Sequence, residues 1–97
     1  MSTKEEKILD LELKLWKCAN GNPYAAGPGH AEQLVKLDRQ RASQLARSMQ
    51  EFHDSQMDDV MFRSSQMTRR QIEKAKQCAD WAVGVRDWLV QYGAERP

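Results

Sequence analysis

The sequence predicts an all-α fold: a long second helix and a third helix form an antiparallel hairpin, and a Gly/Pro loop connects them to a shorter N-terminal helix. Apolar residues recur at helical spacing over residues 3–19, 30–65 and 68–92. The same 97 residues contain no convincing set of strand patterns. A chain of this length is expected to form one all-helical domain, spanning 1–97.

The first helix is expected over about residues 3–19. Ser2 or Thr3 can cap it, and Glu5 and Glu6 suit its first turn. Its apolar residues cover roughly 220°, whereas an ordinary surface helix carries a stripe of about 100°. They are Ile8, Leu9, Leu11, Leu13, Leu15, Trp16 and Cys18. The wide arc indicates that this helix touches structure on more than one side, within its own chain or on a partner. The alternation of leucines also permits a strand, but the cap and the flanking charges favour helix.

The loop over residues 20–29 is predicted to be a hinge. A phosphate-binding loop would end in Gly-Lys-Ser/Thr after a strand, whereas "GNPYAAGPGH" ends in Gly-His after a helix. Asn20 or Gly21 suits a left-handed helix end, and Gly29 or His30 is expected to cap the next helix. Tyr24, with Ala25 and Ala26, is expected to hold the crossing against the bundle.

The second helix is predicted over about residues 30–65. Its apolar residues keep one phase within about 60° of a common direction. They are Ala31, Leu34, Val35, Ala42, Leu45, Ala46, Met49, Phe52 and Val60. One continuous helix would be roughly 50 Å long. The alternative is a break near Asp54–Ser55, which leaves open whether the helix is continuous through residues 53–59.

The third helix is predicted over about residues 68–92. Thr68 and Gln71 form a capping-box pattern at its start, and Gly93 is suited to end it. It carries two apolar stripes. The first comprises Ile72, Ala75, Ala79, Val83 and Val90, and the second comprises Trp81, Val85, Trp88 and Tyr92. Gly84 costs about 1 kcal/mol relative to alanine inside a helix. Close packing of another helix is one explanation for it, and a glycine that is simply tolerated is the other.

Composition argues against several functions. The net charge of +1 gives no global attraction to nucleic acid or to an anionic membrane, and no apolar run is long enough to span a bilayer. The N-terminus lacks the apolar core of a secretion signal, so we expect a cytoplasmic protein that binds no membrane. In that reducing compartment Cys18 and Cys78 are expected as free thiols, with a structural disulfide as the alternative.

Catalytic and metal-binding patterns are weak. Cys18, His30, His53 and Cys78 are scattered, without CxxC or HxxxH spacing, so we expect no metal and no cofactor. The serines lack a nucleophile elbow, and the two histidines do not support a recognisable triad. A lone histidine such as His53 on an apolar face is more often packed in a core or an interface than catalytic. The chain is therefore expected not to be an enzyme.

The stretch "RSMQEFH", from Arg47 to His53, resembles the arginine-then-histidine spacing of HEPN-type ribonucleases, which are also helical bundles. The resemblance covers seven residues and implies RNA cleavage by this pair. On a straight helix, however, the two side chains point about 120° apart. A HEPN-like ribonuclease is therefore a weaker alternative.

A nucleic-acid-associated protein is the stronger alternative. Its binding residues would be a basic cluster between Arg63 and Lys76. The cluster comprises Arg63, Arg69, Arg70, Lys74 and Lys76. Nearby acidic residues favour a solvated face of mixed charge, and long helices do not suit a helix-turn-helix.

The leading hypothesis is a small non-enzymatic interaction protein. Methionine and aromatic residues are typical of interface centres, and three helices of this size struggle to cover every apolar stripe. The expected partner is a larger protein or complex, or a second copy in a homodimer. Adaptors, inhibitors and accessory factors, including those of phages and mobile elements, have this size and style. The predicted contact residues are Trp81, Trp88, Tyr92, Met57, Met61 and Phe62, with Arg69 and Arg70 as polar anchors.

Overall fold

The computed structural model describes residues 3–97, which form four α-helices and one short 3-10 helix. Within these residues there is no strand, so the all-α class is confirmed, whereas the predicted count of three helices is wrong. The elements are α1 (Lys4–Ala19), α2 (Pro28–Leu37), α3 (Arg39–Arg63), η1 (Ser64–Gln66) and α4 (Arg69–Gln91).

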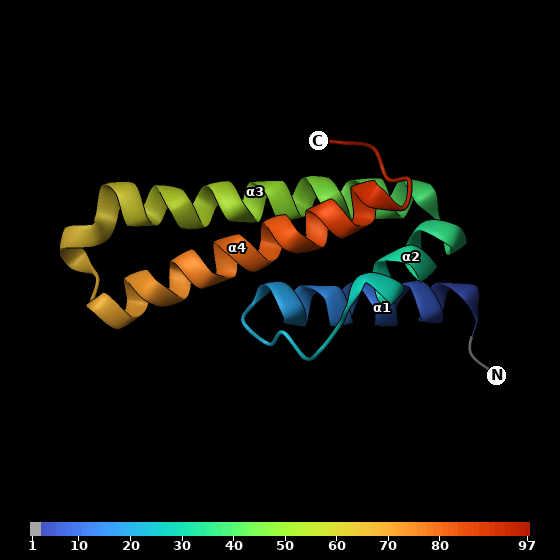
Figure 1. Cartoon of the computed structure of the whole chain (residues 1–97), viewed down its shortest axis with the longest axis horizontal. Helices are drawn as coiled ribbons and strands as arrows, with labels where there is room; N and C mark the ends of the chain where they lie inside the picture. Colours follow the sequence, from blue (N-terminus) through green and yellow to red (C-terminus); the bar gives the residue numbers. More distant parts are fainter. Residues whose placement is uncertain (1–2) are drawn as a thin grey trace.

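The longest two helices, α3 and α4, lie side by side as an antiparallel hairpin, with η1 at the turn (Figure 1). The start of α4 carries the expected capping box. The Thr68 hydroxyl accepts the Gln71 N–H at 3.1 Å, and the Gln71 side-chain oxygen accepts the Thr68 N–H at 2.8 Å. These two bonds satisfy backbone donors that lack a partner within the helix, and they fix where α4 begins.

The predicted second helix is two helices, divided at Asp38. The backbone of Asp38 is extended, at φ −159° and ψ 95°, and the Asp38 N–H donates to the Leu34 carbonyl at 2.9 Å. The Asp38 carboxylate accepts the Arg41 N–H at 3.1 Å, which makes Asp38 the N-cap of α3. A carboxylate that bonds the backbone two or three residues ahead competes with helix continuation. The break therefore lies at Asp38, and α3 is continuous through residues 53–59, so the alternative of a break near Asp54–Ser55 is wrong.

The loop between α1 and α2 turns the chain back on itself. Gly21 has φ +109°, the left-handed conformation that ends α1, and its N–H donates to the Cys18 carbonyl. The N-cap of α2 is Gly27, earlier than the expected Gly29 or His30, and the His30 ring accepts the Gly27 N–H at 3.1 Å. Tyr24 is 96% exposed, so the expectation that it holds the crossing against the bundle is wrong, whereas Ala26 packs against the core.

The buried core lies where α1 and α2 pack against one half of the hairpin. Thr3 caps α1 by accepting the Glu6 N–H. Four predicted apolar positions of α1 are buried: Ile8, Leu11, Leu15 and Cys18. Leu9 and Leu13 remain 51% and 53% exposed, so the wide apolar arc of α1 is covered only in part. Arg41 of α3 pairs with both Glu5 and Glu12, and these carboxylates raise the pKa of its guanidinium above the usual value.

The C-terminal residues fold back along the start of α3. Gly93, at φ +123°, ends α4 as expected. The Arg39 side chain then donates to the Gly93 carbonyl at 2.7 Å, and the Ser43 hydroxyl accepts the Glu95 N–H at 2.9 Å. Ala94 is buried between them and the core. These bonds attach the end of the chain to α3.

Candidate protein-interaction surface

One half of the hairpin extends past the core. The members of the buried cluster nearest to the hairpin turn are Met49 on α3 and Ala82 on α4. Beyond them, over residues 53–78, α3 and α4 continue to η1 and project past the end of α1 (Figure 1). We call residues 53–78 the arm. The molecule measures 48 × 26 × 17 Å, and the arm accounts for much of its long axis.

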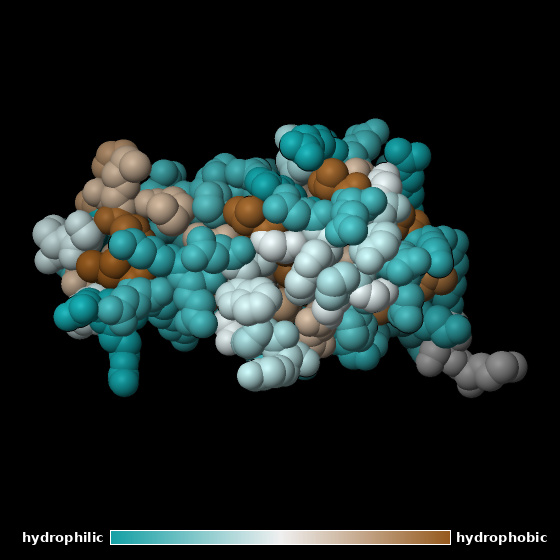
Figure 2. All heavy atoms as spheres, viewed as in Figure 1, coloured by the Kyte–Doolittle hydropathy of each residue, from teal (hydrophilic) through white to brown (hydrophobic). Residues whose placement is uncertain are grey.

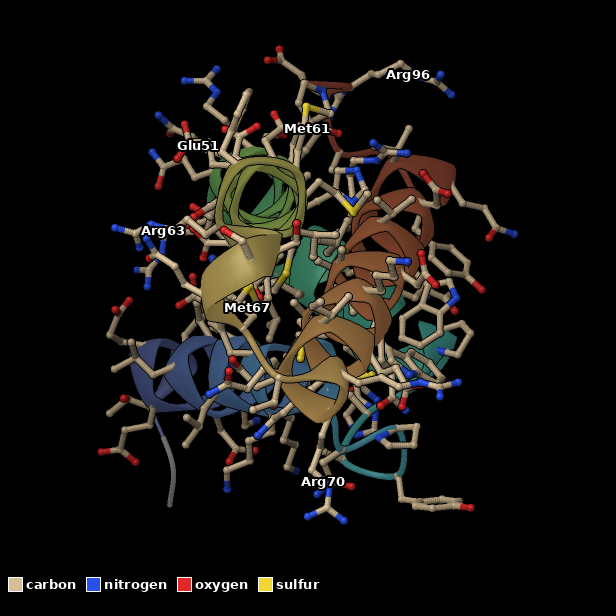
Figure 3. All side chains as sticks on the ribbon, turned by 90° about the vertical axis from the view of Figure 1, so that its left-hand side faces the viewer. Glu51, Met61, Arg63, Met67, Arg70 and Arg96 are labelled. Atoms are coloured by element: carbon tan, nitrogen blue, oxygen red, sulfur yellow. The ribbon has the colours of Figure 1, made fainter. Side chains whose placement is uncertain are left out.

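The arm exposes large apolar side chains near its end. Met61 is 69% exposed and Phe62 is 75% exposed, while Met57 is half-buried one helical turn before Met61. Figure 2 shows apolar residues gathered at this end of the molecule, and Figure 3 shows Met61 pointing outward from the edge of α3. Phe62 lies about 100° further round the helix. Apolar atoms therefore face solvent on more than one side of the arm.

The predicted aromatic contact residues lie elsewhere. Trp81, Trp88 and Tyr92 are half-buried and pack against the main core. Tyr92 stands at the other end of α4 from the arm, roughly 35 Å from its first residue. The structure therefore separates the predicted contact residues into two groups. Met57, Met61 and Phe62 stay together on the arm with Arg69 and Arg70, and the three aromatics form part of the fold.

The predicted basic cluster does not converge. Arg63 lies 3.9 Å from Asp59, and Arg69 lies 3.2 Å from Glu73. Figure 3 shows Arg63 and Arg70 extending to different sides of the molecule. The remaining two members, Lys74 and Lys76, are exposed and point about 200° apart on α4. A phosphate backbone would meet these charges on several faces rather than along one.

The residues of the ribonuclease resemblance are also separated. Arg47 is exposed, whereas His53 faces α4, with its Nδ1 3.2 Å from the Ala79 carbonyl. This places the imidazole in a contact between helices and away from Arg47. No group of three or more His, Cys, Asp or Glu within residues 3–97 is arranged to hold a metal ion. Cys18 and Cys78 are buried free thiols, and burial raises the pKa of the Cys18 thiol.

A groove on the arm was missed by the sequence reasoning. It is an open hollow of about 430 Å³ between α3 and α4, next to the end of α1. Its lining residues are Asn20, Phe52, Gln56, Met67, Gln71, Lys74, Ala75 and Cys78. The α4 members recur at helical spacing, which signals a shared face. The sequence alone does not show that α1 stops short of this face, because that depends on how α1 packs.

No protein-family model, curated protein sequence or solved structure matches this chain. In the part of the chain that the structure describes, every helix is too short or too polar to cross a bilayer. Inferences about function therefore depend on the surface of the molecule itself.

Proposed function

We propose that this chain is a small, non-enzymatic cytoplasmic protein that binds a larger protein or complex through its arm and modulates it. The observation that carries the proposal is the exposure of Met61 and Phe62 at the end of a hairpin that projects past its own core. Covering large exposed apolar side chains with another surface removes apolar area from water, which is favourable in free energy. Methionine is suited to such contacts because its flexible thioether adapts to the opposing surface.

The proposal is tested by affinity purification from the natural host with an N-terminal tag, followed by mass spectrometry. The double variant Met61→Asp/Phe62→Asp should lose the partner that the wild type retains. Tyr24→Asp is the control, because it places one such carboxylate at a 96% exposed aromatic position outside the arm. If the double variant and Tyr24→Asp recover the same partner as the wild type, the surface around Met61 and Phe62 is not the binding surface.

A homodimer is the second form of the same proposal. Sizing by light scattering across a concentration series separates the two. A dimer that becomes a monomer in the Met61→Asp/Phe62→Asp variant would identify a second copy as the partner.

Nucleic-acid binding remains the alternative. It is favoured by the exposed side chains of Arg70, Lys74 and Lys76, for which the structure gives no ion pair among residues 3–97. Binding through these groups should weaken steeply as salt rises. A gel-shift titration at low salt tests it, and the absence of a shift removes this alternative.

A further inference from the structure

We propose that the groove on the arm, called the arm groove from here on, binds an amphipathic helix of a partner protein. The apolar stripe of that helix is flanked by carboxylates. This inference rests on the proposed function and adds a second contact surface on the arm, because the groove lining does not include Met61 or Phe62. The arm groove is the hollow of about 430 Å³ described above. Its lining residues are Asn20, Phe52, Gln56, Met67, Gln71, Lys74, Ala75 and Cys78.

The groove continues the surface on which α1 packs. α1 lies against α2 and α4 and ends at Ala19, where Asn20 caps it and Gly21 turns the chain away. Asn20 itself lines one end of the groove. A second helix placed past Asn20 would therefore lie on the hairpin as α1 does, along the half that α1 does not reach (Figure 1).

The shape of the groove suits a helix. Its floor contains two small buried residues of α4, Ala75 and Cys78, so an incoming backbone can approach closely. Phe52, at the core end of the arm, and Met67, next to the turn, are the larger apolar residues of its lining, and Met67 adapts readily. An amphipathic helix laid into an apolar groove is a recurrent mode of peptide recognition.

The groove extends toward the end of the arm. A neighbouring hollow of about 360 Å³ shares Met67 and Gln71 with it and reaches Arg63. Along α3 the two hollows together run from Phe52 to Arg63, roughly 16 Å. That length accommodates about three turns of helix, or about 11 residues.

The charge of the rim selects the partner. Lys74 lines the groove, and Arg70 lies one turn before it on the same side of α4. Arg63 stands on the α3 side and is balanced by Asp59 at 3.9 Å. Figure 3 shows Arg63 and Arg70 on either side of Met67 at the turn end of the hairpin. The excess is positive, so carboxylates beside the apolar stripe complement it and lysines do not.

The test uses two synthetic peptides of about 12 residues with the same leucine stripe, one flanked by glutamates and one by lysines. Binding is followed by NMR of the full-length protein, through the Met67 methyl group and the amides of Gln71, Ala75 and Cys78. The glutamate peptide should shift these signals, and the lysine peptide should not. No shift at millimolar glutamate peptide, or equal shifts with both peptides, would overturn the proposal.

Lys74→Glu should lower the affinity for the glutamate peptide by about tenfold and raise the affinity for the lysine peptide. Lys76→Glu is the matched control, since it makes the same charge change on the opposite side of α4 and should leave binding unchanged. Equal effects of the two variants, or self-association of the free protein that Lys74→Glu abolishes, would count against a partner helix. If the peptides fail while Met61→Asp/Phe62→Asp still loses its partner, the groove inference falls and the proposed function stands.

Discussion

The indole ring of Trp16 on α1 meets the phenyl ring of Phe52 on α3 edge to face, with centroids 5.7 Å apart and ring planes at 86°. Both rings are half-buried and pack against the core. Phe52 also lines the arm groove, so this pair marks the boundary between the covered half of the hairpin and the arm. Edge-to-face pairs add stability beyond the area that they bury.

Phe52→Ala should lower the free energy of unfolding by about 2 kcal/mol, because it removes a partly buried aromatic ring and its contact with Trp16. Urea denaturation measures this value. A double-mutant cycle with Trp16→Ala should give a coupling of about 0.5–1.5 kcal/mol. Tyr24→Ala serves as a control, with an expected change within about 0.5 kcal/mol. Zero coupling would show that the two rings stabilise the fold independently.

Asp38→Ala should lower the free energy of unfolding by about 1 kcal/mol, because α3 loses the side chain that accepts the Arg41 N–H. Asp38→Asn retains an acceptor oxygen and should have a much smaller effect. Thermal or urea unfolding of both variants tests the cap. If alanine stabilised the protein instead, residues 30–65 would prefer the continuous helix that the break at Asp38 prevents.

Trp88→Ala should destabilise the protein by about 2–3 kcal/mol, since the indole packs against the core. The predicted role of Trp88 as a contact residue requires the opposite result, namely lost binding with unchanged stability. Measuring the stability of Trp88→Ala by urea denaturation and its partner binding by affinity purification distinguishes a core role of Trp88 from a contact role. The same comparison applied to Met61→Asp/Phe62→Asp should give lost binding with little change in stability.

Stability should fall as the pH rises above about 9, the ordinary pKa of a cysteine thiol. Burial raises the pKa of Cys18 in the folded state, so at alkaline pH the unfolded chain releases this proton first. The unfolded state then binds fewer protons than the folded one, and the stability present below pH 9 is lost. Urea unfolding between pH 7 and pH 10 in reductant measures the slope. Cys18→Ala should be less stable throughout but should flatten that slope.

The local features of the fold were predictable because each depends on a few neighbouring residues. Thr68 with Gln71 forms its capping box from side chains three positions apart, and Gly93 ends α4 through its own backbone freedom. The break at Asp38 was not predictable from periodicity. It occupies one residue, and the apolar phase of α2 resumes in α3 at Ala42, so the pattern looks continuous.

The candidate site was predictable only in part. Met57, Met61 and Phe62 were identified from residue type and remain on the surface or near it. The structure buries part of each stripe of α4: Ala75 and Ala79 of the first and Val85 of the second, while Trp81 and Trp88 are half-buried. Which members of a stripe are covered depends on the packing of distant segments, and no local pattern encodes it. The arm groove, which Met67 lines, likewise depends on how α1 packs against the hairpin.

The uneven distribution of the core has a consequence for hydrogen exchange. The arm has small residues, Ala75 and Cys78, at its buried seam, whereas leucines and Met49 fill the rest of the core. Regions with few buried apolar contacts open without global unfolding. Amide protection should therefore decrease along the hairpin from Met49 toward Ser64–Gln66. A bound partner would slow exchange most in the arm, because that segment has the largest opening fluctuations to suppress.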